Sequence, residues 1–198
     1  GLPKKLTDPA WKPDFGPAAF TPKVAKTGAI AISARGFLVA YNVNLNTTST
    51  RRANAIAFDL REAGRVLTED GSPTGKKILD ASGEPVRIPG KLKAVKGIGW
   101  FIEEYGIAQI SYNLTNIAIT SVHKAFDETV NAAAERGLRV TGSELIGLIP
   151  KQAMLDAADY FLAKQERSLG IDEAEKIKIA VKSLGLDDLK PFNPKERI

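Results

Sequence analysis

The apolar residues of this chain change their periodicity along the sequence in an order that few folds accommodate. Segments with the two-residue alternation of a strand and segments with the spacing of an amphipathic helix follow one another as β-α-β-β-α-β, and two more helices come after. The predicted strands are residues 37–45, 93–104, 107–114 and 138–149, and the predicted helices are residues 50–63, 121–136 and two stretches after Pro150. This order predicts an α+β fold, a ferredoxin-like βαββαβ sandwich with a four-stranded antiparallel sheet and extra C-terminal helices.

Prolines and glycines divide the chain into parts. Residues 1–36 contain five prolines, which exclude long helices and central strands there, so we expect a structured linker whose aromatic residues pack against a neighbour. Residues 37–198 form the folded domain. Within it, residues 66–90 are polar and rich in Gly and Pro, which predicts a surface insertion containing a small hairpin.

The composition excludes several kinds of site. The chain has no cysteine and a single histidine, so disulfides and cysteine nucleophiles are excluded and we expect no metal. It has no apolar stretch long enough to span a bilayer and no signal or transit segment, so we expect one piece of a cytoplasmic protein without a membrane partner.

The positive charge lies in the first half of the chain. Residues 1–60 carry eight basic and three acidic residues, whereas residues 99–198 carry twelve basic and fifteen acidic ones, and the whole chain has a formal net charge of +5. This asymmetry is typical of a protein with an anionic partner, and also of an ordinary solubilising surface.

The predicted sheet has one face that the helices do not account for. Strand alternation places five polar residues on that face: Asn42, Asn44, Gln109, Ser111 and Asn113. Asparagine is unfavourable in strands, so this concentration indicates a face that lines a ligand groove or meets another domain, with a merely solvated face as the alternative. Gly97 and Gly99 share one side of their strand and leave room for another backbone or a flat ligand.

Several long segments resemble the glutamate formimidoyltransferase (formiminotransferase) family, and they occur in the family's order over nearly the whole chain. These segments are residues 14–20 (Asp14-Phe15-Gly16-Pro17-Ala18-Ala19-Phe20), 34–45, 60–65, 92–100, 108–114, 142–150 and 191–198. The resemblance implies a transferase of histidine degradation and one-carbon metabolism that moves a formimino group from N-formimino-L-glutamate to the co-substrate tetrahydrofolate. It also implies that folate lies in a groove between the sheets of two subdomains, of which this chain is the C-terminal one.

The resemblance further assigns individual residues. It implies folate binding by Gly16, Pro17, Ala18, Ala19, Phe20 and Gly28 in the linker, with Lys23, Lys26 and Arg35 available for the carboxylates of folate. It places the catalytic histidine in an N-terminal subdomain, a partner that this chain does not contain. His123 matches a non-catalytic histidine, so we expect no catalytic residue in this chain.

Two alternatives stay open at the level of the sequence, namely an RNA-binding module and a regulatory interaction domain with no chemistry. The βαββαβ order and the positive charge also suit an RNA-binding ferredoxin-like module, although the third strand offers Gln109, Ser111 and Asn113 where such a module needs stacking aromatics. The formiminotransferase interpretation involves no nucleic acid. It leaves open whether the chain forms a homodimer.

Overall fold

The structure, a computed structural model, describes residues 1–72 and 74–198 and divides the chain into two compact units, Gly1–Arg35 and Gly36–Ile198. The first unit contains only short helices, namely α1 (Leu2–Leu6), the 3-10 helix η1 (Pro9–Trp11) and α2 (Pro22–Thr27). All residues of this unit are described, and Val24 is its one buried side chain. Within this unit Trp11, Phe15 and Phe20 are exposed, because so short and proline-rich a segment builds no core of its own.

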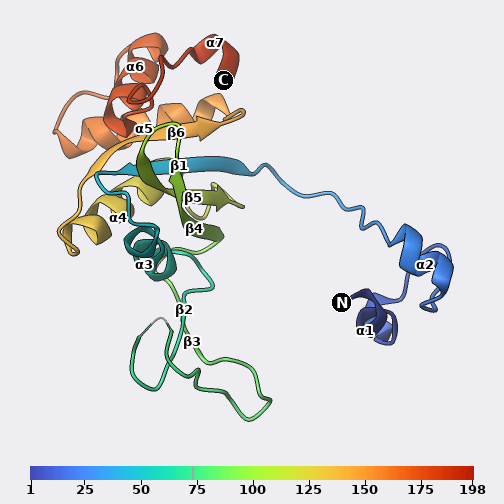
Figure 1. The fold of residues 1–198 in the computed structure, drawn as a ribbon. Coiled ribbons are helices and arrows are strands. Elements are labelled where there is room, and N and C mark those ends of the chain that lie inside the picture. The colour runs from blue at the N-terminus through green and yellow to red at the C-terminus, as the bar shows by residue number, and fades with distance from the viewer. Residues whose placement is uncertain (73) are drawn as a thin grey trace. The chain divides into compact units, whose positions relative to one another are not determined.

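The second unit is built on a four-stranded sheet (Figure 1). Its strands are β1 (Val39–Leu45), β4 (Val95–Ile102), β5 (Ile107–Leu114) and β6 (Val140–Ile146). They lie in the order β4-β5-β1-β6, and every neighbouring pair is antiparallel. With α3 (Thr50–Leu60) between β1 and β4, and α4 (Val122–Ala134) between β5 and β6, this is the predicted α+β ferredoxin-like sandwich.

The two crossover helices cover one face of the sheet. Each begins at a serine cap, since Ser49 accepts from Arg52 N at 3.3 Å and Ser121 accepts from Lys124 N at 3.4 Å. Helix α3 packs against β4 and β5, and α4 packs against β1 and β6. The core therefore lies between this layer and the odd-numbered side chains of β1, which are Val39, Tyr41, Val43 and Leu45 and are fully buried.

The C-terminal helices protect the outer edge of β6. Helices α5 (Lys151–Lys164) and α6 (Glu173–Leu184) pack on each other, and α6 ends at Gly185 in the left-handed conformation. The edge strand donates from Ser143 N to Gly185 O at 2.9 Å, so a backbone group that would otherwise stay open for pairing is satisfied. The C-terminal tail contains the short helix α7 (Pro194–Arg197).

Within residues 65–90, of which Pro73 lies outside the described residues, the predicted small hairpin is present only in part, because residues 87–88 pair with residues 65–66 and not with residues 78–80. Strands β2 (Arg65–Val66) and β3 (Arg87–Ile88) pair at its base, and Leu79 bridges to Pro85 near its tip. Helix α3 ends at Leu60, before the predicted end near residue 63, because the chain turns at Arg61 to an extended conformation.

Glycine brings β4 against the backbone of α3. A Cβ atom on Gly99 would lie 2.3 Å from the backbone nitrogen of Asn54, so only glycine fits. The Asn54 side chain accepts from Gly99 N at 2.9 Å and donates to Gly99 O at 3.0 Å, which occupies the outer edge of β4 at this point. The sequence allowed either another backbone or a flat ligand beside this glycine. The structure places the backbone of α3 there.

We expect Gly99→Ala to lower the free energy of unfolding by about 1 to 3 kcal/mol, because α3 must move to admit the methyl group. Urea denaturation followed by circular dichroism measures the loss. Gly36→Ala is the matched control, since nothing lies within 4 Å of its Cβ position. An equal effect of both substitutions would contradict the packing role of Gly99.

Candidate functional site

The face of the sheet opposite α3 and α4 carries three rows of residues that cross all four strands. The strand register sets the rows, which are Lys96–Asn113–Ala40–Ile146, Ile98–Ser111–Asn42–Glu144 and Trp100–Gln109–Asn44–Gly142. We call this surface the open face. All five polar residues that the sequence placed together, Asn42, Asn44, Gln109, Ser111 and Asn113, lie on it.

Apolar side chains stand exposed along the two outer strands of the open face. Ile98 is 52% exposed and Trp100 is 43% exposed on β4, and Ile146 is 48% exposed on β6. Lys96 lies beside Ile98 on the same side of β4 and is also exposed. An aromatic ring, two aliphatic side chains and a cation suit a flat, partly apolar ligand that carries negative charge.

The carboxamides at the centre of the open face form a hydrogen-bonded network. Asn42 Nδ2 donates to Gln109 Oε1 at 3.3 Å, and Gln109 Nε2 donates to Asn44 Oδ1 at 2.8 Å. Asn44 Nδ2 donates onward to Asp188 Oδ2 at 3.0 Å, from the segment that follows α6. Each amide thereby gains a partner for groups that would be costly to bury alone.

This network changes the picture of an open groove lined by carboxamides. Asn42, Asn44 and Gln109 are 3%, 0% and 0% exposed, because Asp188 and Glu144 bond to them from the surface side. Ser111 is half-buried and Asn113 is exposed. A ligand on this face would therefore meet Asn113 and Ser111 directly, and the other three only through the groups that they hold.

Sequence reasoning did not single out Lys96, Ile98, Trp100 or Glu144 as site residues. The signal was present in β4, where Gly97 and Gly99 turn toward α3 and alternation sends Ile98 and Trp100 to the opposite face. For Glu144 the signal was weaker, since a glutamate on an outer strand is usually solvated.

A shallow pocket continues the open face at the outer edge of β4. Arg61 lines this pocket, and its Nη1 donates to Gly97 O at 3.3 Å. The guanidinium of Arg61 also lies 3.9 Å from the centre of the Phe58 ring. Burial, and to a lesser extent Arg87, lower the pKa of Arg61. The residues that line this pocket are Arg61, Glu62, Ala63, Val95, Lys96, Gly97, Ile98 and Thr115.

The predicted folate-binding residues of the linker all lie exposed in the first unit. Gly16 and Gly28 have φ angles of 84° and 73°, which favour glycine, and nothing lies within 4 Å of either Cβ position. Pro17, Ala18 and Ala19 are exposed, and Phe20 is 45% exposed. Thr21 caps α2, which carries Lys23 and Lys26.

His123 lies at the start of α4, in the helical layer of the domain. Its ring stacks on Tyr160 of α5 with the centroids 4.5 Å apart, and its Nε2 lies 2.8 Å from Ser121 Oγ. Asp127, one helical turn further along α4, accepts from Tyr160 Oη at 2.5 Å and pairs with Lys164. Burial lowers the pKa of His123, and nearby Asp156 and Asp127 oppose the shift.

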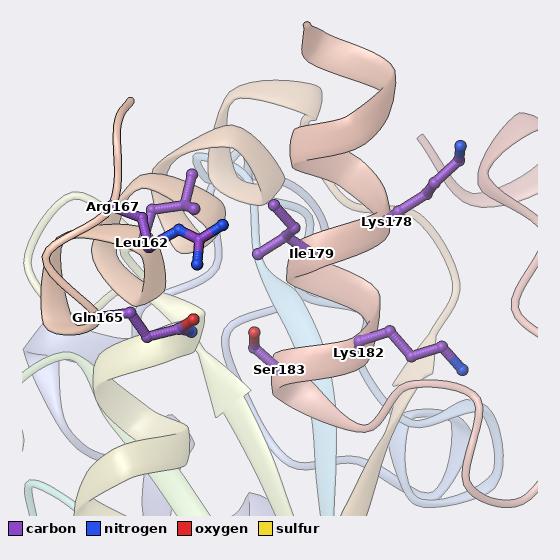
Figure 2. A pocket seen from close by; sticks show the side chains of 7 residues that line it. All are labelled: Leu162, Gln165, Arg167, Lys178, Ile179, Lys182 and Ser183. Carbon is purple, nitrogen blue, oxygen red and sulfur yellow. The ribbon is translucent and has the colours of Figure 1, made fainter. Parts of the chain in front are cut away.

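A second pocket lies between the end of α5 and α6, away from the open face (Figure 2). Figure 2 shows Lys178 and Lys182 extending from α6 away from Arg167. Lys178 bonds to Glu175 and Lys182 pairs with Asp187, so two of the three cations are already neutralised. We therefore leave this pocket out of the candidate site.

Two searches of the described part of the chain bear on the kind of site. In residues 1–72 and 74–198, no helix is long and apolar enough to cross a membrane. In the same residues, no three side chains of His, Asp or Glu are grouped so that they would hold a metal ion.

We expect the stability of the protein to fall as the pH drops below about 6.5, the usual pKa of histidine in an unfolded chain. The folded state holds His123 neutral to a lower pH, so the unfolded state binds the proton more readily in this range. His123→Gln should flatten the dependence of the free energy of unfolding on pH between 7 and 5, measured by urea denaturation. An identical slope in both proteins would show that His123 does not titrate differently on folding.

The comparisons with known proteins agree with the resemblance seen in the sequence. The formiminotransferase domain matches residues 40–198. The formimidoyltransferase-cyclodeaminases of Dictyostelium discoideum and Gallus gallus are 46% and 45% identical to the chain over its whole length, and the match covers 32% of each relative. The glutamate formimidoyltransferase of Thermoplasma acidophilum is 35% identical over 81% of the chain and 44% of its own length. The chain thus spans about a third of the first two relatives, and it belongs to the formiminotransferase domain family.

Proposed function

We propose that this chain is the folate-binding C-terminal part of a glutamate formimidoyltransferase. The complete enzyme moves the formimino group of N-formimino-L-glutamate to tetrahydrofolate, in the degradation of histidine. The relatives are named for formimidoyl transfer, and the chain matches about a third of the longer ones, which supports its being one part of a larger catalytic unit.

The observation that carries this proposal is the open face of the sheet. A ferredoxin-like domain with helices on one side has a second side to cover, and here that side combines Ile98, Trp100 and Ile146 with hydrogen-bonding groups and Lys96. The arrangement suits a pteridine ring packed on apolar surface, with an N-terminal subdomain closing the groove from the other side. A solvated surface would expose fewer large apolar residues on one face of a sheet.

The proposed reaction needs two substrates held together and one group to move a proton. A tetrahydrofolate nitrogen attacks the formimino carbon, the bond from that carbon to the glutamate nitrogen breaks, and the proton lost by the folate nitrogen ends on the departing amine. The domain contributes positioning, which is worth several kcal/mol in a two-substrate transfer. His123 packs against α5 in the helical layer, which supports a general base supplied by the N-terminal subdomain.

The linker supplies the second set of proposed contacts. Gly16 and Gly28 present backbone groups without a side chain to obstruct a ligand, and Phe20 offers a ring for stacking. Lys23, Lys26 and Arg35 provide positive charge for the glutamate carboxylates of folate.

We expect Trp100→Ala to raise the dissociation constant for tetrahydrofolate by about tenfold or more, because the exposed indole is lost as a stacking surface. Isothermal titration calorimetry on the 198-residue chain, with and without the N-terminal subdomain, measures it. Leu169→Ala is the control, since Leu169 is 44% exposed and follows α5. Unchanged affinity in Trp100→Ala, or no folate binding by the unaltered chain under either condition, would contradict the proposed groove wall.

We expect Phe20→Ala to weaken the same binding, because the linker would lose its stacking ring. Phe15→Ala serves as the matched control, since Phe15 is 94% exposed and lies in the same segment outside residues 16–20. Tight binding that is equal in Phe20→Ala and the unaltered chain would remove the linker from the folate site while leaving the open face in place.

A further inference from the structure

Glu144 is a half-buried carboxylate held on the open face by three neutral donors. Its Oε2 accepts from Asn42 Nδ2 at 3.3 Å and from Gln109 Nε2 at 3.2 Å. Its Oε1 accepts from Tyr105 Oη at 3.3 Å. The two carboxamides are themselves fixed by the buried network, so the position of the carboxylate is set by the sheet beneath it.

No cation neutralises this carboxylate in the described part of the chain. Lys190, which comes near Tyr105, pairs with Glu104 at 3.2 Å, and Glu144 takes part in no salt bridge. A carboxylate offers about four acceptor positions, and the three donors leave one of them and the negative charge available on the outer side. A fixed, partly desolvated anion in this setting favours a ligand that brings hydrogen-bond donors and positive or polarised charge.

We infer that Glu144 is a ligand-binding residue whose remaining acceptor position takes an N–H group of a planar, cationic or polarised N–C–N unit. The inference rests on the proposed function and names a residue of the same site. Neutral donors behind the carboxylate fix its plane without cancelling its charge, so the free acceptor position on Oε1 is preorganised for a charge-assisted hydrogen bond from an N–H group.

Both substrates of the proposed reaction contain such a unit. The formimino group of formiminoglutamate is an amidine, which is protonated at neutral pH and has N–H groups on both nitrogens. The pteridine ring of folate has a 2-amino group beside a ring N–H. Glu144 would recognise either unit by the same charge-assisted N–H hydrogen bond, and titration with each substrate identifies the source.

The first experiment uses formamidinium chloride as the probe and does not depend on the enzyme's function. The side-chain amide signals of Asn42 and Gln109 in a ¹H–¹⁵N spectrum report directly on Glu144, because both amides donate to it. We expect formamidinium to shift these signals in the unaltered chain and not in Glu144→Gln, and sodium chloride at equal concentration, a salt whose cation has no N–H donor, to leave them in place. Equal shifts with both salts, or none with formamidinium, would overturn the inference while leaving the proposed function to its own Trp100 test.

The second experiment measures the dissociation constants of tetrahydrofolate and of N-formimino-L-glutamate for Glu144→Gln. Glutamine keeps an acceptor for Asn42 and Gln109 but loses the charge, so we expect the fold to persist and one constant to rise about tenfold or more. Glu104→Gln is the control, since Glu104 is exposed, follows β4 and pairs with Lys190. If the chain binds folate and neither constant rises in Glu144→Gln, Glu144 serves only to satisfy the carboxamides and the inference fails.

Discussion

The hydrogen bonds of three buried carboxamides determine which part of the open face is covered and which part a ligand can reach. Asn42, Asn44 and Gln109 sit on the side that the crossover helices leave uncovered, where an amide without a partner would cost roughly 1 to 3 kcal/mol. They satisfy one another and then reach two carboxylates, Glu144 on the neighbouring strand and Asp188 from the segment after α6. The network therefore holds the C-terminal segment to the sheet at one end of the open face. At the other end the network leaves β4 and β5 accessible. The same hydrogen bonds therefore attach the C-terminal segment to the sheet and leave the candidate site exposed.

The two sides of β4 show how a single strand can serve packing and ligand binding together. Toward the helices it presents Gly97 and Gly99, which let the strand approach Tyr112 and the backbone of α3. Toward the open face it presents Lys96, Ile98 and Trp100, which are all exposed. Successive side chains of a strand point to opposite faces of the sheet. Because Gly97 and Gly99 face the helices, residues 96, 98 and 100 face the open side. The hydrogen bonds from the Asn54 and Arg61 side chains to the backbone of β4 occupy its outer edge and restrict the movement of the strand.

The fold was predictable from local patterns because each element carries its own signal. The serine caps at Ser49 and Ser121, the left-handed Gly185 and the alternation in β1 and β5 all act within a few residues. Alternation also placed Asn42, Asn44, Gln109, Ser111 and Asn113 on one face correctly. It could not show which of them are covered, since Asn44 meets Asp188 across 144 positions of sequence. The stacking of His123 on Tyr160 is likewise a contact between residues far apart in the sequence, and no local pattern specifies it. Local patterns also do not specify how exposed Phe20 is.

The two charged residues of the open face lie far apart, and their separation bears on which substrate Glu144 would contact. Glu144 on β6 and Lys96 on β4 stand at opposite edges of the sheet, separated by three strand spacings, or about 14 Å. A ligand that used both would need its N–H donors at one end and its carboxylates at the other, at a comparable separation. Formiminoglutamate carries its amidine and its carboxylates only a few bonds apart, too close to reach both edges. In folate, a bicyclic ring and a benzoyl group separate the N–C–N edge from the glutamate, so the spacing across the sheet favours the pteridine as the partner of Glu144.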